Sequence, residues 1–124
     1  MKKNIFLIVF AIVFVGFSVN AQEQNHEAHH KAEFKKEVFT VYGNCGMCER
    51  TIEGSLKDVD GVTLADWDKE TDQMKVSFNP EAITLDAIKQ KIADVGYDSD
   101  THRAKDKVYN SLPGCCQYER PNKN

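Results

Sequence analysis

The chain has no excess of basic side chains, with 16 Lys and Arg against 19 Asp and Glu and a formal net charge of −3 over 124 residues. A mildly acidic chain is a poor candidate for binding nucleic acid or an anionic membrane surface, because both ligands attract positive charge. The acidic residues are scattered, and no two are placed as a pair for general acid–base catalysis. We therefore expect a protein that is not an enzyme and does not bind nucleic acid.

Long apolar runs are also missing, apart from Ile5–Phe17. This run is shorter than the roughly 20 residues that a membrane-spanning helix needs. Two lysines precede it and Val19-Asn20-Ala21 follows, which is the pattern of a signal peptide over residues 1–21 with cleavage after Ala21. An uncleaved anchor is the rival interpretation. No cysteine follows the run directly, so no lipid attachment site is apparent. We expect a periplasmic or secreted protein without membrane insertion after cleavage.

Cysteine is scarce, and its four copies form two close pairs. Cys45 and Cys48 are spaced Cys-x-x-Cys, whereas Cys115 and Cys116 are adjacent. An even number of cysteines outside the cytosol usually predicts disulfides, but a structural disulfide normally joins distant segments. A bond between adjacent cysteines would also close a strained ring. The two pairs therefore favour roles as metal ligands or redox groups.

Residues 22–36 are polar and lack apolar periodicity, so we expect a mobile leader there. It contains His26, His29 and His30. Imidazole can ligate Cu(II) or Zn(II) near neutral pH, which makes these residues candidate auxiliary ligands. A histidine cluster in such a leader is commonly an adventitious site, and that alternative stays open.

The spacing of apolar residues predicts six elements between residues 37 and 106. In chain order these are a strand over 37–42, a helix over 47–58, strands over 62–68 and 73–79, a helix over 84–95 and a weak edge strand from Tyr97. The order β-α-β-β-α-β predicts an α+β, ferredoxin-like sandwich, with two helices on one face of a four-stranded antiparallel sheet. The expected core is Phe39, Val41, Ile52, Leu56, Val59, Ala65, Trp67, Met74, Val76, Phe78, Leu85, Ile88, Ile92 and Val95.

The Cys45-x-x-Cys48 loop lies where the first strand gives way to the first helix. Backbone N–H groups at a helix N-terminus stabilise a thiolate, which is the form of cysteine that binds metal. Two thiolates on one loop suit soft ions such as Cu(I), Zn(II), Cd(II) or Hg(II). A structural zinc site needs four ligands, and no histidine or third cysteine is near in sequence. We expect low coordination, with a position open to a ligand from a partner.

The sequence around this loop resembles the heavy-metal-associated domain of copper chaperones, copper-ATPase amino-terminal domains and the periplasmic mercury-binding protein. The resemblance covers about residues 37–106 and rests on Val41-x-Gly43 before the Cys-x-x-Cys motif, the element order and Gly96-Tyr97 after the second helix. It implies that Cys45 and Cys48 are the metal ligands and that Tyr97 lies beside their loop.

One departure from the family pattern concerns the residues that support the loop. The family usually has Gly-Met-x-Cys, in which the Met anchors the loop in the core, whereas Gly43-Asn44-Cys45 is one residue shorter and lacks that Met. Gly43, Asn44 and Met47 are the candidate support residues here, together with Tyr97. Met47 lies between the two cysteines and is not expected to replace the missing anchor.

Residues 107–124 form a tail in which Pro113-Gly114 argues against a long helix. Its Cys115 and Cys116 could form a second thiolate site, or fold back to complete the first one. The extended chain from Lys107 to Cys115 spans up to about 26–29 Å, which is enough to return across a small domain. Intermolecular disulfides, or a link to Cys45 or Cys48, are the other interpretations.

We therefore predict an exported protein that captures a soft metal ion and transfers it by thiolate ligand exchange. Cu(I) is the expected ion, with Hg(II) or Zn(II) as the others, and the partner is a membrane metal transporter or another metal-binding domain. We expect a monomer, with a metal-bridged dimer as the alternative. Two other functions stay open: a thiol–disulfide redox protein, and a sequestering or sensing protein that uses all four cysteines.

Overall fold

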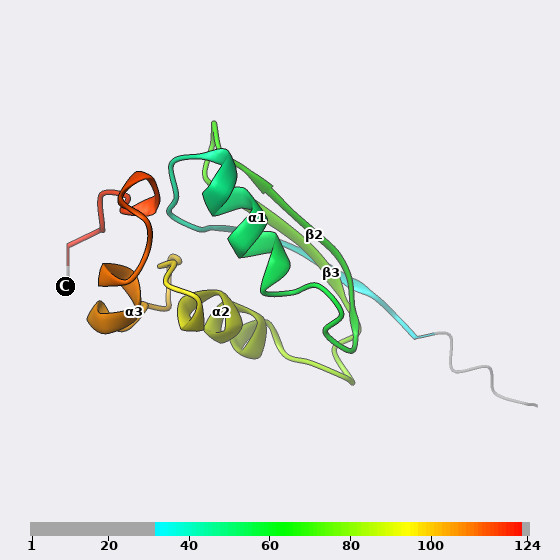
Figure 1. Ribbon diagram of the computed structural model, residues 1–124. Helices are drawn as coiled ribbons and strands as arrows, with labels where there is room; N and C mark the ends of the chain where they lie inside the picture. The colour runs from blue at the N-terminus through cyan, green and yellow to red at the C-terminus, as the bar shows by residue number, and fades with distance from the viewer. Residues whose placement is uncertain (1–31, 123–124) are drawn as a thin grey trace, which may run out of the picture. The chain divides into compact units, whose positions relative to one another are not determined.

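A computed structural model describes residues 32–122 (Figure 1). The predicted signal peptide and the leader histidines His26, His29 and His30 lie outside these residues. Within residues 32–122, no helix is both long and apolar enough to cross a membrane.

Seven elements follow one another along the described chain. They are β1 (Lys35–Thr40), α1 (Gly46–Gly54), β2 (Val62–Asp68), β3 (Gln73–Phe78), α2 (Leu85–Asp94), α3 (Asp106–Asn110) and the 3-10 turn η1 (Gly114–Cys116). The predicted strands and helices up to residue 95 are all present. The first helix ends earlier than predicted, because Leu56 N donates to Glu53 O at 3.1 Å and Lys57 N to Gly54 O at 3.3 Å, the tighter pattern of a fraying end.

The sheet has three antiparallel strands in the order β1-β3-β2. Helices α1 and α2 lie on the same side of this sheet (Figure 1). The start of α2 is fixed by Thr84, whose Oγ1 accepts a hydrogen bond from Ala87 N at 3.1 Å, as expected of a helix cap. Its end is fixed by Gly96, which has a φ of +108°. This is the ferredoxin-like α+β arrangement with one strand fewer than predicted.

The fourth strand is not confirmed, because within residues 32–122 the last predicted strand forms only one isolated antiparallel bridge, between Val41 and Ser99. The chain turns away directly afterwards, where Ser99 N donates to His102 O at 2.8 Å. The buried Asp98 carboxylate is held at this point by Arg120, with Nη2 donating to Oδ1 at 2.7 Å. Among the described residues, pairing with the end of β1 is limited to this bridge and its two backbone hydrogen bonds, from Tyr42 N to Asp98 O at 2.9 Å and from Asp100 N to Thr40 O at 3.1 Å.

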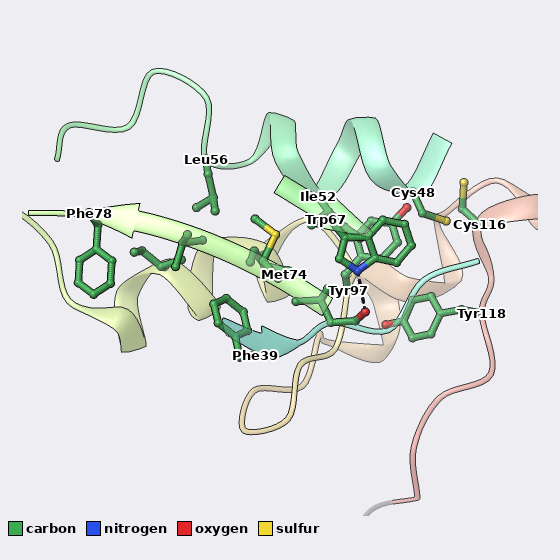
Figure 2. Packing of buried hydrophobic residues seen from close by; sticks show 14 residues of the cluster. Phe39, Cys48, Ile52, Leu56, Trp67, Met74, Phe78, Tyr97, Cys116 and Tyr118 are labelled. Atoms are coloured by element: carbon green, nitrogen blue, oxygen red, sulfur yellow. Dashed lines mark hydrogen bonds between the residues drawn. The ribbon is translucent and has the colours of Figure 1, made fainter. Parts of the chain in front are cut away.

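The core between the sheet and the helices matches the predicted set closely (Figure 2). The predicted residues that are buried are Phe39, Val41, Ile52, Leu56, Trp67, Met74, Val76, Phe78, Ile88 and Ile92. Val59, Ala65, Leu85 and Val95 are half-buried instead. The same cluster contains four residues that were not in the predicted core: Cys48, Tyr97, Cys116 and Tyr118.

The C-terminal segment, residues 105–122, packs on the domain. Leu112 lies against Gly96, where a Cβ atom would come within 3.0 Å of the leucine side chain. Tyr118 stacks on Tyr97 with ring centroids 5.6 Å apart. The predicted tail therefore forms part of the packed structure and carries Cys116 into the core.

Candidate soft-metal site

Cys45 and Cys48 lie at the start of α1. Cys45 is the residue before the helix and has extended backbone angles, and its carbonyl oxygen accepts from Glu49 N at 3.1 Å. Cys48 is in the first turn and is buried, because the apolar stripe that includes Ile52 faces the core. The strand-to-helix turn thus gives one half-exposed thiol and one buried thiol on the same loop.

The structure brings both cysteine pairs together, and all four cysteines are free thiols. The Sγ atom of Cys45 lies 3.2 Å from that of Cys48 and 3.8 Å from that of Cys116. Cys116 Sγ lies 3.9 Å from Cys115 Sγ, and the sulfurs of Cys45, Cys115 and Cys116 all lie within 4.8 Å of one another. Figure 2 shows the side chains of Cys48 and Cys116 near each other at one end of the buried cluster.

No third cysteine is near the loop in sequence, but the fold brings Cys115 and Cys116 to it. Cys115 and Cys116 are 67 or more positions from Cys48 in sequence, so spacing alone could not place them there. Of the interpretations left open for the C-terminal pair, the contacts favour a pair that folds back on the first site. Cys45 is the sulfur that touches both pairs.

The thiols of Cys45 and Cys116 differ in their ease of ionisation. The backbone N–H of Cys48 faces the Cys45 sulfur and, with the Cys48 thiol and the N–H of Met47, lowers the pKa of Cys45 to about 7. The sulfur makes no full capping hydrogen bond, so this is the field of the helix start rather than a formed cap. Burial raises the pKa of Cys116 to about 12. Of these two thiols, Cys45 is therefore the one that ionises more easily and is the better nucleophile and metal ligand near neutral pH.

Trp67 on β2 supports the loop, a role that sequence reasoning missed because it assigned this residue only to the core. Its Nε1 donates to Val41 O at 2.9 Å, and its ring lies against Gly43. A Cβ atom at Gly43 would come within 2.8 Å of the ring and 3.2 Å of Cys48 Cβ. The indole ring thus packs against the loop and holds it in place. The sequence signal for this role was the absence of the usual loop Met, which indicated that another residue had to anchor the loop.

The other predicted support residues take separate positions. Asn44 Oδ1 accepts a hydrogen bond from the Cys48 thiol at 3.1 Å. Met47 is 48% exposed and does not enter the core, as expected, but its Sδ lies 3.6 Å from Cys115 Sγ. The thioether therefore extends the row of sulfurs at the rim of the site.

Tyr97 is fully buried beside the thiols of Cys48 and Cys116 (Figure 2). Its hydroxyl has no hydrogen-bond partner among the described residues. Burial, followed by the interaction with Cys48 and Cys116, raises the pKa of Tyr97, so the hydroxyl stays protonated. A protonated hydroxyl next to sulfur is a donor that a ligating thiolate could accept from.

The comparisons with known proteins cover the domain that carries the first cysteine pair. Residues 38–98 match the profile of the heavy-metal-associated domain. The copper chaperone CopZ of Staphylococcus aureus strain JH9 is 36% identical over 64 residues, which are 51% of this chain and 94% of that protein.

Two solved structures have a similar fold. Oxidized MerP from Ralstonia metallidurans CH34 has a TM-score of 0.52 at 28% identity, covering 55% of this chain and 96% of that one. The water-soluble region of the P-type ATPase CopA from Bacillus subtilis has a TM-score of 0.52 at 33% identity, covering 55% of this chain and 46% of that one. Cys115 and Cys116 lie beyond the matched residues 38–98.

Proposed function

The chain belongs to the heavy-metal-associated domain family, and from that premise we propose that it is an exported carrier of a soft metal ion. The thiolates of Cys45 and Cys48 capture the ion, which is Cu(I) in the first place, and the protein passes it to a partner. The ion is cargo, and the chain performs no catalysis on it.

One observation carries this proposal: the Cys45 and Cys48 sulfurs lie 3.2 Å apart at the start of a helix, with Cys45 half-exposed. A thiolate pair on one loop can hold a soft ion while one side of the ion remains accessible. The lowered pKa of Cys45, about 7, allows capture near neutral pH without a separate base. Each thiol that binds the ion as a thiolate releases its proton to solvent.

The choice of metal follows from the ligand type and from the similar proteins. Thiolates select Cu(I) and Hg(II) over harder ions. Zn(II) in a structural site requires four ligands, more than this loop supplies by itself. The similar proteins include a copper chaperone and MerP. We therefore place Cu(I) first, with Hg(II) or Zn(II) as further ions to be tested.

Transfer takes place by ligand exchange. A thiolate of the partner forms a bond to the ion and one protein sulfur leaves; a second partner thiolate then displaces the other protein sulfur, and each released sulfur takes up a proton from solvent. We expect the partner to be a membrane metal transporter or another metal-binding domain, because the soluble region of a P-type ATPase has a similar fold. The N-terminal signal-peptide pattern supports an extracytoplasmic location. We expect the carrier to act as a monomer.

The test is an anaerobic titration of the reduced protein with Cu(I), Zn(II) and Hg(II). The Cys45→Ser/Cys48→Ser variant is expected to lose the tight Cu(I) site, because both proposed ligands are removed. Cys115→Ser is the control, since it removes one exposed thiol and leaves the loop pair intact. Unchanged Cu(I) stoichiometry and affinity in the double variant would refute the proposal.

A further inference from the structure

The C-terminal segment brings a thiol into the loop site from outside the part of the chain that matches the family. We propose that Cys116 is a third thiolate ligand to the ion held by Cys45 and Cys48, so that the segment supplies from within the chain the ligand that a partner would otherwise contribute. This inference rests on the proposed function. It specifies how many thiolates hold the ion at that site and how the ion is released from it.

The separation between the sulfurs of Cys45 and Cys116 fits this assignment. With metal–sulfur bonds of about 2.3 Å, ligand sulfurs lie about 3.8 Å apart in a tetrahedral site and about 4.0 Å apart in a trigonal one. Cys45 and Cys116 are 3.8 Å apart. Cys45 and Cys48, at 3.2 Å, have to open on loading, which the half-exposed Cys45 side chain allows. The long-range pair is thus the one that already has the spacing of ligands.

Burial of Cys116 also points to the site. Its side chain is 1% exposed, and it faces the thiols of Cys45 and Cys48 and the hydroxyl of Tyr97. A buried thiol among three polar groups is poorly explained as simple apolar packing, and one of these groups, the Tyr97 hydroxyl, has no hydrogen-bond partner within residues 32–122. A metal ion bound to the sulfurs would turn them into strong acceptors for that hydroxyl.

The segment after Cys116 is held firmly. Arg120 forms a two-pronged ion pair with the buried Asp98, with Nε donating to Oδ2 at 2.8 Å and Nη2 to Oδ1 at 2.7 Å. The Tyr118 hydroxyl accepts from Asp98 N at 2.8 Å and donates to Gly96 O at 2.9 Å. Because the ordering of the segment is achieved by folding, Cys116 binds as a preorganised ligand without a further entropy cost.

A third internal ligand changes how the ion leaves. The incoming thiolate of a partner must form its bond to the metal while the bond to Cys116 breaks, and Cys116 then takes back a proton from solvent. Without Cys116, the incoming thiolate would enter an open position. The intact protein is therefore expected to hold Cu(I) more tightly and to release it more slowly than a two-thiolate loop.

Cys115 is the matched comparison within the same turn. It is exposed and contacts the Met47 thioether at 3.6 Å, whereas Cys116 is buried and contacts Cys45. Both residues carry one thiol, and both sulfur atoms lie within 4.8 Å of the Cys45 sulfur. The assignment predicts that removing Cys116 alters the bound ion and that removing Cys115 does not alter its coordination.

The experiment loads the reduced, otherwise complete chain anaerobically with one equivalent of Cu(I). X-ray absorption is expected to count three sulfur neighbours in the parent protein and in Cys115→Ser, but two in Cys116→Ser and Cys116→Ala. Excess bathocuproine disulfonate is expected to remove Cu(I) about tenfold faster from both Cys116 variants. This difference reflects the loss of the third metal–sulfur bond, which we expect to be of modest strength. Two different replacements separate ligand loss from a packing effect of either side chain.

Two sulfur neighbours in the parent protein would overturn the inference, whether or not the Cys116 variants fold. An equal effect of Cys115→Ser and the Cys116 variants would overturn it as well. Neither result affects the proposed function, which fails only if the parent protein does not bind Cu(I) or if Cys45→Ser/Cys48→Ser still binds it tightly.

Discussion

The two cysteine pairs of this protein reach the same site by different means. Cys45 and Cys48 meet because they are three residues apart on a loop that enters a helix, so local geometry is enough. Cys116 meets Cys45 across 71 positions, because Tyr118 and Arg120 fasten the C-terminal segment to the domain. A short motif can therefore indicate where a metal binds and still give an incomplete ligand set.

Detaching the C-terminal segment should have the largest effect. Arg120→Gln leaves the Asp98 carboxylate, 1% exposed, without its main charge partner. We expect the free energy of unfolding to fall by about 3–5 kcal/mol, as for other broken buried ion pairs. Urea denaturation of the metal-free, reduced protein measures this loss.

Arg103→Gln is the control for that change, since Arg103 lies 3.7 Å from Asp98 Oδ2 but its side chain is 32% exposed. We expect its loss to cost about 1 kcal/mol or less. If the two arginine variants were equally stable, the ion pair with Arg120 would not be what fastens the segment.

An intermediate effect is expected from disturbing the loop of the first pair. Gly43→Ala places a Cβ atom within 2.8 Å of the Trp67 ring and 3.2 Å of Cys48 Cβ. The ring or the loop must shift, and overpacking of this kind lowers the free energy of unfolding by about 1–3 kcal/mol. Because the loop carries Cys45 and Cys48, Cu(I) affinity should fall as well, which a competition titration measures.

Gly46→Ala serves as the control, since no atom lies within 4 Å of its added methyl group and the residue opens α1. We expect it to be neutral or to stabilise the fold by up to about 1 kcal/mol, because alanine favours the helix. A Gly43→Ala protein as stable as the Gly46→Ala protein would show that Trp67 does not fix the loop.

The smallest effect concerns protonation and leaves the fold intact. In the reduced, metal-free protein, the alkylation rate of Cys45 by iodoacetamide should rise with a midpoint near pH 7, because its pKa is lowered to about 7. Cys116, whose pKa is raised to about 12, should react only on unfolding. Peptide mass spectrometry resolves the two sites.

The sign of the accompanying pH dependence follows from the same shift. As the pH falls through 7, Cys45 takes up a proton that competes with the metal, so Cu(I) affinity should weaken below that pH. In Cys45→Ser the alkylation phase with a midpoint near pH 7 should disappear. Its persistence would assign the reactive thiol to another cysteine.

Much of the fold was predictable because each element is marked locally. Thr84 and Gly96 delimit the second helix, and the apolar alternation in Met74, Val76 and Phe78 marks a buried strand face. The short extent of the fourth strand was not, because the backbone oxygen of Asp98 accepts from Tyr42 N beside β1 while its carboxylate binds a distant side chain. Arg120 provides the distant partner, and no local pattern indicates that pairing.

The sequence by itself determined the family, the element order and the two thiols of the Cys45-x-x-Cys48 loop, since these depend on contacts between residues a few positions apart. Only the tertiary structure decided that Cys116 joins them, that Trp67 replaces the missing loop anchor, and that the sheet stops at three strands within residues 32–122. Each of these outcomes depends on which distant residues come into contact. The free energy of the whole packed domain determines these contacts, and short-range periodicity and motif spacing carry no information about them.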